Sequence, residues 1–187
     1  MNLNRAIKEG ARFVRRLEAE SGQKISDCNQ CGKCTAGCPL GFAMDLMPNQ
    51  VMHLIRVGLW AEVLESRTIW LCSHCAVCTT RCPRNIDLAR VMDSLRITAR
   101  REGRIGSERS IALFNEIFLD SVRRYGRAHE FGIGLRHNLL TRRPFKDSDL
   151  GRVWLRRGKL KLGTRKIKGA AEIDRIFSEV ERTEDGR

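Results

Sequence analysis

Hydrophobic residues recur at helical spacing from the start of the chain, separated by charged and polar positions over residues 3–20. A stripe of this kind gives a helix one apolar face, and a glycine such as Gly22 is a typical end signal. The sequence therefore predicts a first helix over 3–20. The residues on its apolar face are Leu3, Ile7, Val14 and Leu17.

Two shorter helical patterns lie in the next part of the chain. Pro48 suits the first position of a helix, because its ring fixes a helical φ and it has no N–H to leave unpaired. Gly58 follows as the end signal of this helix, and residues 60–67 predict another short one. The apolar side of the helix after Pro48 consists of Val51, Leu54 and Ile55.

Three further helices are predicted toward the C-terminus. Asp87 can cap one that runs to about residue 102, before Gly103. Ser107 can cap the next, which ends near Gly126, and the last covers 170–181. Their apolar stripes are Leu88, Val91, Met92 and Leu95, then Ile111, Phe114, Ile117, Phe118 and Val122, then Ile173, Ile176, Phe177 and Val180.

Convincing strand alternation is absent from the chain, so the predicted fold class is mainly α. The longest apolar stretch, 51–64, contains His53, Arg56 and Glu62. It is also shorter than the roughly 20 residues that span a bilayer. The first twenty residues lack the apolar core of a secretory signal. We therefore expect no transmembrane segment and a cytoplasmic protein, whose cysteines stay reduced.

The cysteines form two tight runs and are not scattered. Each run follows C-x2-C-x2-C-x3-C and is followed at once by a proline. A disulfide framework would spread its cysteines to join distant loops, so runs of this kind indicate metal ligands. We call residues 28–39 the first cysteine run and residues 72–83 the second cysteine run. Their cysteines are Cys28, Cys31, Cys34 and Cys38, and Cys72, Cys75, Cys78 and Cys82.

The first three cysteines of each run fit one corner of a [4Fe–4S] cubane, because each thiolate takes one iron. The fourth iron needs a ligand from elsewhere, and in two-cluster ferredoxins this ligand is the cysteine before proline in the other run. We therefore predict two [4Fe–4S] clusters with crossed ligation. Cluster 1 takes Cys28, Cys31, Cys34 and Cys82, and cluster 2 takes Cys72, Cys75, Cys78 and Cys38.

Two structural zinc sites are the alternative metal assignment. Zinc sites with four cysteines usually combine two separated C-x2-C pairs. Here each run offers three close cysteines and a fourth before proline, which favours the clusters. His74, inside the second cysteine run, either bonds a cluster sulfur or faces solvent.

The sequence carries no signature of a catalytic site. It has no G-x-G-x-x-G dinucleotide motif and no adjacent cysteine pair that could hold an unusual catalytic cluster. The two clusters use all eight cysteines, so none is left for dithiol chemistry. These features favour a non-catalytic electron relay.

The cysteine motifs also carry a family resemblance. CNQCGKCTAGCP at 28–39 and CSHCAVCTTRCP at 72–83, joined by a helical stretch, resemble the alpha-helical ferredoxin domain. Over about residues 20–105 the chain is similar to the C subunits of heterodisulfide reductases and their relatives. The resemblance implies a complex with a flavin-containing subunit and with a catalytic subunit that holds noncubane clusters. This chain would pass electrons between them, in a heterodisulfide reductase or a heterodisulfide-reductase-like complex.

The C-terminal part of the chain is strongly basic. Lys and Arg number 35 against 22 Asp and Glu, which gives a net charge of +13. Two oxidised clusters with their thiolates would lower this charge to about +9. A basic segment can bind nucleic acid, but residues 136–168 contain only Phe145 and Trp154 as aromatics, too few for a stacking platform. We expect no nucleic-acid binding.

The sequence therefore divides into an N-terminal helix (1–22), an alpha-helical ferredoxin domain (23–125) and a basic C-terminal arm (126–187). Repeated glycines favour an extended path for the arm before its last helix. We interpret the arm as a docking segment for an acidic partner surface. The alternative to the relay is a nucleic-acid-binding or structural iron–sulfur or zinc module.

Overall fold

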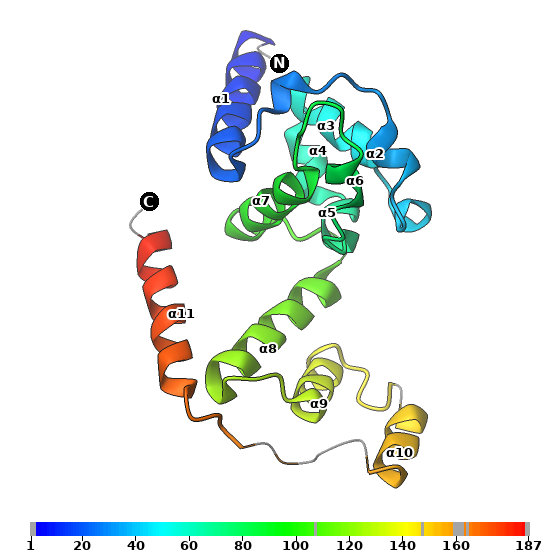
Figure 1. Cartoon of the computed structure of the whole chain (residues 1–187), viewed down its shortest axis with the longest axis vertical. Helices are drawn as coiled ribbons and strands as arrows, with labels where there is room; N and C mark the ends of the chain where they lie inside the picture. Colours follow the sequence, from blue (N-terminus) through cyan, green and yellow to red (C-terminus); the bar gives the residue numbers. More distant parts are fainter. Residues whose placement is uncertain (1–2, 107, 147, 159–162, 164, 186–187) are drawn as a thin grey trace. The chain divides into compact units, whose positions relative to one another are not determined.

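The computed structural model describes residues 3–106, 108–146, 148–158, 163 and 165–185 (Figure 1). All regular elements among these residues are helical, which confirms the mainly α fold class. Contacts divide the chain into an N-terminal unit, Met1–Arg109, and a C-terminal unit, Ser110–Arg187. No helix in the described part is long and apolar enough to cross a membrane.

Short helices alternate with loops in the N-terminal unit, and longer helices dominate the rest. The elements of the N-terminal unit are α1 (Leu3–Ser21), η1 (Ile25–Asp27), α2 (Lys33–Ala36), η2 (Gly41–Ala43), α3 (Pro48–Arg56), α4 (Trp60–Glu65), α5 (Thr68–Leu71), α6 (Val77–Thr80) and α7 (Leu88–Arg101). The remaining helices are α8 (Arg109–Tyr125), α9 (Glu130–Leu140), α10 (Ser148–Arg156) and α11 (Ala170–Asp185).

The helices predicted from apolar periodicity are all present, as α1, α3, α4, α7, α8 and α11. Asp87 caps α7 as predicted, because its carboxylate accepts a hydrogen bond from the backbone N–H of Arg90 at 3.2 Å. The predicted cap Ser107 lies outside the described residues. The glycines predicted to end helices have left-handed φ values, which are 67° at Gly22, 86° at Gly58, 67° at Gly103 and 74° at Gly126.

Helix α7 lies at the centre of the N-terminal unit, where it contacts α1, α4, α5 and α6. Its predicted apolar stripe is buried throughout. On α1, Leu17 is buried as predicted, whereas Val14 is only half-buried. Phe13 is buried in addition, since it precedes Leu17 by one helical turn and stacks on Trp60 with ring centroids 4.7 Å apart.

The two cysteine runs lie at the edge of this core. No residue of 28–39 or 72–83 is fully buried, although the flanking helices α3 and α7 contribute buried side chains. The core therefore holds the helices, and the cysteine loops extend from it with few apolar contacts of their own.

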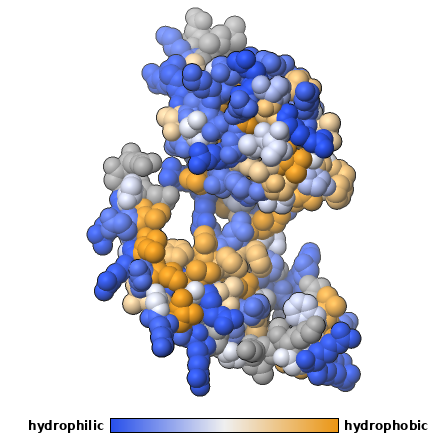
Figure 2. Space-filling view, viewed as in Figure 1, coloured by the Kyte–Doolittle hydropathy of each residue, from blue (hydrophilic) through white to orange (hydrophobic). Residues whose placement is uncertain are grey.

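The C-terminal unit buries much less apolar surface. Ile117 and Ile133 are buried, but predicted stripe residues Phe114 and Phe118 are 44% and 39% exposed. Figure 2 shows hydrophobic residues at the surface over α8 and α11. The predicted stripe of α11 is partly open, because Ile176 and Val180 are 58% and 53% exposed whereas Ile173 and Phe177 are half-buried.

The prediction of an extended path before the last helix is wrong for residues 130–140 and 148–156, which form α9 and α10. At Gly132, one of the two glycines of α9, the packing leaves little room for a side chain. A Cβ at Gly132 would lie 2.5 Å from Nδ1 of His129, so a side chain there would displace the ring. The described residues 163 and 165–167 have no regular secondary structure.

Contacts group α8 with the C-terminal unit, whereas the predicted domain 23–125 would place it with the cysteine runs. Ser121 on α8 accepts a hydrogen bond from the backbone N–H of His129 at 2.9 Å. The backbone N–H of Ile167 also reaches the carbonyl of Tyr125 at 3.0 Å. Periodicity locates α8 but not its neighbours, so the sequence could not assign it to a unit.

Candidate metal centre

The two cysteine runs follow the same backbone path. Gln30 and His74, each just before the second cysteine of its run, have φ of 56° and 55°. Gly32 and Ala76, each just after that cysteine, have φ of 74° and 59°. A four-residue helix then follows in each run, α2 or α6, and these two helices contact each other. The sequence repeat is therefore also a structural repeat.

We expect Gly32→Ala to lower the free energy of unfolding by about 1 kcal/mol, because a Cβ in the left-handed region costs roughly this much. Nothing lies within 4 Å of the Cβ that this change would add, so the cost is conformational. The equivalent change Ala76→Gly is expected to be neutral or stabilising, since relief of strain offsets the greater freedom of the unfolded chain. Anaerobic thermal unfolding of the cluster-loaded protein measures both.

Ala36→Gly is the matched control, because Ala36 lies in the right-handed helix α2. It is expected to cost about 1 kcal/mol. Equal losses for Ala36→Gly and Ala76→Gly would contradict the role of the left-handed turn.

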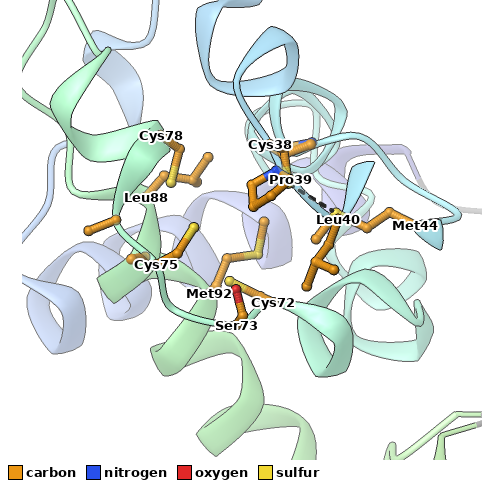
Figure 3. Close-up of a pocket in the computed structure, with 13 residues that line it drawn as sticks. Cys38, Pro39, Leu40, Met44, Cys72, Ser73, Cys75, Cys78, Leu88 and Met92 are labelled. Atoms are coloured by element: carbon orange, nitrogen blue, oxygen red, sulfur yellow. Dashed lines mark hydrogen bonds between the residues drawn. The ribbon is translucent and has the colours of Figure 1, made fainter. Parts of the chain in front are cut away.

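Cys38 of the first cysteine run lies around one cavity with three cysteines of the second cysteine run, as Figure 3 shows. These three are Cys72, Cys75 and Cys78. The structure thus brings together the whole ligand set predicted for cluster 2. The cavity wall is otherwise largely apolar, and its larger side chains are Leu40, Met44, Leu88 and Met92.

Burial affects the protonation of two of the thiols around the cavity. Burial raises the pKa of Cys72 and Cys78, and the charge of Cys38 raises the pKa of Cys72 further. The backbone N–H of His74 and the charge of Arg96 act in the opposite direction at Cys72. The metal-free thiols therefore favour the protonated form, and cluster binding must release their protons.

For cluster 1, the chain that follows Cys82 lies beside the chain that leads into Cys28. Arg84 donates through Nε to the carbonyl of Asp27 at 3.2 Å, and its guanidinium is 3.7 Å from the Asp27 carboxylate. Burial also raises the pKa of the Cys34 thiol. The Arg84 contacts bring the chain after Cys82 to the entry of the first cysteine run, the arrangement that crossed ligation by Cys82 would need.

Two N–H groups donate to sulfurs of the ligand set predicted for cluster 1. Nε2 of Gln30 lies 3.4 Å from Sγ of Cys28. The backbone N–H of Ile86 reaches Sγ of Cys82, also at 3.4 Å. Both donors would stabilise charge on the sulfurs once they are thiolates.

The donor set around the cavity fits a cubane. Within the described residues, no three Cys, His, Asp or Glu side chains are placed so that they could hold a single metal ion. A cubane instead needs four thiolates on four separate irons around an enclosed space. The cavity offers four thiols and has no carboxylate or imidazole in its lining, which suits thiolate-bound iron.

Asp45 supports the cavity, and sequence reasoning missed it. Its carboxylate accepts hydrogen bonds from the backbone N–H groups of Arg67 at 2.8 Å and Thr68 at 3.0 Å, and from the Thr68 hydroxyl at 2.7 Å. Partial burial opposes these bonds, but together they hold the pKa of Asp45 below its usual value. The loop with Leu40 and Met44 is thereby fixed to the start of α5. No spacing signal links Asp45 to Thr68.

Of the two interpretations of His74, exposure to solvent is confirmed. Its Nδ1 faces Nη2 of Arg96 at 3.5 Å. Arg96 is a second residue that sequence reasoning missed, because nothing in the helical stripe of α7 marks it.

Comparison with known proteins agrees with this centre. The 4Fe-4S dicluster domain family matches residues 14–86. This match and the eight cysteines assign two [4Fe–4S] clusters to the chain and argue against the zinc alternative.

The curated relatives are C subunits of named reductases. The chain is 33% identical over 91 residues to that of the H(2):CoB-CoM heterodisulfide,ferredoxin reductase of Methanothermobacter marburgensis, a match that covers 49% of each protein. It is 34% identical over 131 residues to that of the ferredoxin:CoB-CoM heterodisulfide reductase of Methanosarcina acetivorans, which covers 70% of this chain and 48% of the relative. The chain spans about half the length of the curated relatives it matches.

Proposed function

Because this chain is an iron–sulfur protein similar to the C subunits of heterodisulfide reductases, we propose that it is the electron-relay subunit of such a complex. Each [4Fe–4S] cluster can accept one electron and pass it on. The protein would hold two clusters in one small unit, so that an electron received at one can leave from the other.

The position of Cys38 carries this proposal. It lies around the same cavity as three cysteines of the other run, so each run would supply ligands to both clusters. Crossed ligation keeps two clusters close together, which a relay needs and a structural scaffold does not. The contact between α2 and α6 supports the same arrangement, because these helices follow the two left-handed turns.

The apolar residues around the cavity would shield part of cluster 2 from water, although the predicted ligand Cys75 is exposed. Met44 lies 3.9 Å from Cys38, sulfur to sulfur, and Leu88 and Met92 of α7 close another side. Asp45 would hold the loop that carries Met44 in place. A fixed, partly apolar surrounding reduces the reorganisation that accompanies a change of cluster charge.

Reversible reduction of both clusters tests the relay. The anaerobically purified chain is expected to hold about eight irons and eight acid-labile sulfides. Both clusters should take up electrons from dithionite, show electron paramagnetic resonance signals, and return to the starting spectrum on oxidation. Zinc as the main metal, or clusters that resist reduction by every partner of the complex, would contradict the proposal.

We propose two partners, a flavin-containing subunit and a catalytic subunit with noncubane clusters. The relatives that support this assignment are named as C subunits of heterodisulfide reductases. The two partners are tested by purifying this chain through an affinity tag, identifying the untagged proteins that co-purify with it, and analysing them for flavin and iron. A complex without flavin would rule out the flavin-containing partner.

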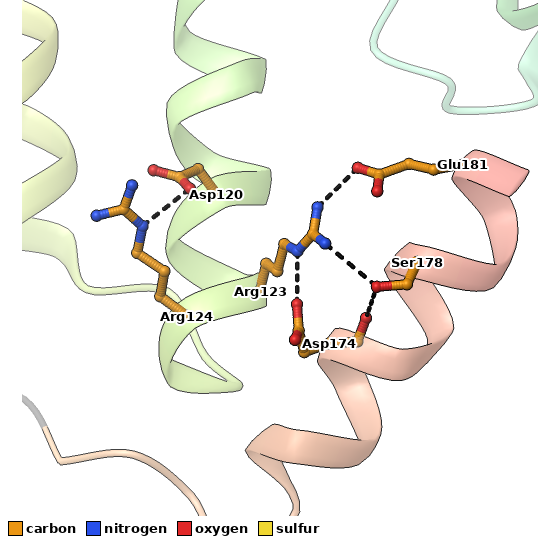
Figure 4. Close-up of polar contacts among 6 residues, drawn as sticks. All are labelled: Asp120, Arg123, Arg124, Asp174, Ser178 and Glu181. Carbon is orange, nitrogen blue, oxygen red and sulfur yellow. Dashed lines mark hydrogen bonds and ion pairs between the residues drawn. The ribbon is translucent and has the colours of Figure 1, made fainter. Parts of the chain in front are cut away.

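The C-terminal unit is the proposed docking part. Its helix α11 is held to α8 by Arg123, which bonds Asp174 at 2.6 Å and Glu181 at 2.7 Å (Figure 4). The acceptors Asp174 and Glu181 are 57% and 59% exposed, so each pair contributes little stability alone. A unit held by exposed ion pairs can adjust to a partner surface.

A groove between α8, α9 and α10 offers the apolar part of this surface. Phe114, Leu135 and Trp154 line it from the three helices. Lys146 and Arg152 also line it, with Glu130 as the acidic member. An acidic, amphipathic segment of a partner protein fits this combination, because its apolar side would fill the groove and its carboxylates would meet the basic residues.

Removal of residues after Arg109 is expected to leave both clusters assembled and to weaken binding to the partner proteins. The cut falls between the two units, whereas a cut after Arg124 would expose the buried Ile117 of α8. Binding of the full chain should weaken as salt rises, since the contact is partly electrostatic. Iron content and a binding titration of the purified partners measure the two effects.

A charge-reversal pair separates docking from general damage. Lys146→Glu with Arg152→Glu should weaken binding by about tenfold or more, whereas Arg12→Glu, on an exposed position of α1, should have little effect. Loss of clusters after the truncation, or unchanged affinity, would exclude the docking role. Retention of the full chain on DNA at physiological salt would instead favour the nucleic-acid alternative.

A further inference from the structure

Two arginines bind the two cysteine runs in equivalent ways. Arg56, the last residue of α3, donates through Nη1 to the carbonyl oxygen of Cys28 at 2.7 Å. Arg96, on α7, donates through Nη1 to the carbonyl oxygen of Cys72 at 3.2 Å. Cys28 and Cys72 are the first cysteines of their runs, so each run is tied at the same point to the long helix that follows it.

The two arginines differ in their exposure to solvent. Arg56 is exposed, whereas the side chain of Arg96 is only 18% exposed. Nη2 of Arg96 is held by Asp93 at 3.2 Å, whose own side chain is 55% exposed. Water and salt screen a charge at the surface more than a partly buried one. The field of Arg96 therefore acts on its surroundings more strongly than that of Arg56.

The charge of Arg96 reaches the cluster ligands. Its guanidinium bonds the carbonyl oxygen of Cys72 at 3.2 Å, so its positive charge lies beside this ligand and favours negative charge there. The same interaction favours any added negative charge at this site. Reduction adds such a charge, because one electron takes the cluster core from 2+ to 1+ with no proton and no bond involved.

The ligands predicted for cluster 1 are contacted by neutral hydrogen-bond donors and not by a partly buried charge. Nε2 of Gln30 donates to the sulfur of Cys28, and the backbone N–H of Ile86 donates to the sulfur of Cys82. Hydrogen bonds to cluster sulfurs raise the reduction potential without a full charge. Gln30 is the side-chain donor of the pair and can be changed by substitution.

We propose that Arg96 selectively raises the reduction potential of cluster 2 through its partly buried charge, and that Gln30 raises that of cluster 1 through its hydrogen bond to Cys28. Arg96 acts through its charge and Gln30 through its hydrogen bond, and neither residue is a cluster ligand. This inference deepens the relay and rests on the crossed ligation proposed above, which assigns Cys72 to cluster 2 and Cys28 to cluster 1.

The test is a redox titration of the full-length, cluster-loaded chain with dithionite, followed by electron paramagnetic resonance. Arg96→Gln is expected to lower the ratio of reduced to oxidised cluster 2 by about tenfold at a fixed potential, which is about 59 mV for a one-electron couple. Cluster 1 should keep its potential. Arg56→Gln, the matched loss of an equivalent but exposed charge, should change either ratio by less than about threefold.

Two further variants separate charge from hydrogen bonding. Arg96→Lys keeps the charge and should retain most of the wild-type potential of cluster 2. Gln30→Met keeps the length of the side chain, removes the N–H donor, and should lower the reduced fraction of cluster 1 alone by about threefold. Two further variants assign the electron paramagnetic resonance signals to the clusters. Cys34→Ser changes a ligand of cluster 1, and Cys78→Ser changes a ligand of cluster 2.

Several results would overturn the inference. They are an unchanged cluster 2 in Arg96→Gln, an equal shift of both clusters, or an equal loss in Arg96→Lys and Arg96→Gln. If Arg96→Gln loses iron, the Arg96→Lys variant tests the inference in its place. A tenfold change in its ratio of reduced to oxidised cluster 2 would exclude the charge mechanism. The isolated chain and dithionite suffice for this experiment, so failure to bind the two proposed partners would refute the relay and leave this inference standing.

Discussion

Cys82→Ser is expected to damage the cluster that is bound by the first cysteine run, although Cys82 belongs to the second. The reason is the crossed ligation, in which Cys82 supplies the fourth iron ligand of cluster 1. Contacts of Arg84 with Asp27 support this placement, because they bring the chain after Cys82 to the entry of the first run. Iron should fall from about eight toward about four per chain.

Two control variants identify the damaged cluster. Cys34→Ser changes a ligand of cluster 1 within the first cysteine run, and Cys78→Ser changes a ligand of cluster 2 within the second. The spectrum of Cys82→Ser should match that of Cys34→Ser. A match to Cys78→Ser would show that each run binds its own cluster. Cys38→Ser should show the opposite result and match Cys78→Ser, because Cys38 lies around the same cavity as the other predicted ligands of cluster 2.

Removal of the clusters is expected to destabilise the N-terminal unit strongly. The loops 28–39 and 72–83 contain no fully buried residue, so we expect bound clusters to supply much of their stability. Four residues near the ligands also have left-handed φ without being glycine, namely Gln30, His74, Ala76 and Asn85. Each such residue costs about 1 kcal/mol, or about 4 kcal/mol in sum, which the bound clusters offset.

A loss of this size lowers the melting temperature of a small unit by on the order of 20 °C. Chelation or air oxidation should therefore lower the helical circular dichroism signal at 37 °C as well as bleach the visible absorption. Hydrogen exchange adds an internal control, because the C-terminal unit contains no cysteine. Helices α8 to α11 should keep their protection while residues 28–39 and 72–83 lose it. Full helicity and an unchanged melting curve in the metal-free chain would contradict the prediction.

Local signals explain why so many helices were predictable. Asp87, Pro48 and the glycines after α1, α3, α7 and α8 act within a few residues of the helix ends that they set. The stripe of α7 was predictable for the same reason, since its residues repeat at the period of one helix. Phe13 was missed because its burial depends on Trp60, which lies on another helix.

Cysteine spacing determined the chemistry of this protein without any tertiary information. Three thiols at i, i+3 and i+6 and a fourth before proline select a cubane cluster, because the ligands of one corner lie within seven residues. The mainly α fold class also followed from the sequence, since helical periodicity and end signals are local.

Only the tertiary structure decided which residues surround the centre. Asp45 and Thr68, or Arg96 and Cys72, lie more than twenty residues apart, and contacts across such distances depend on how the helices pack. The same holds for α8, whose stripe was visible in the sequence while its place in the C-terminal unit was not. Helix α9 escaped prediction because glycines within it are unfavourable locally, and its N-terminal flank is fixed by a contact between His129 and Ser121 of another helix.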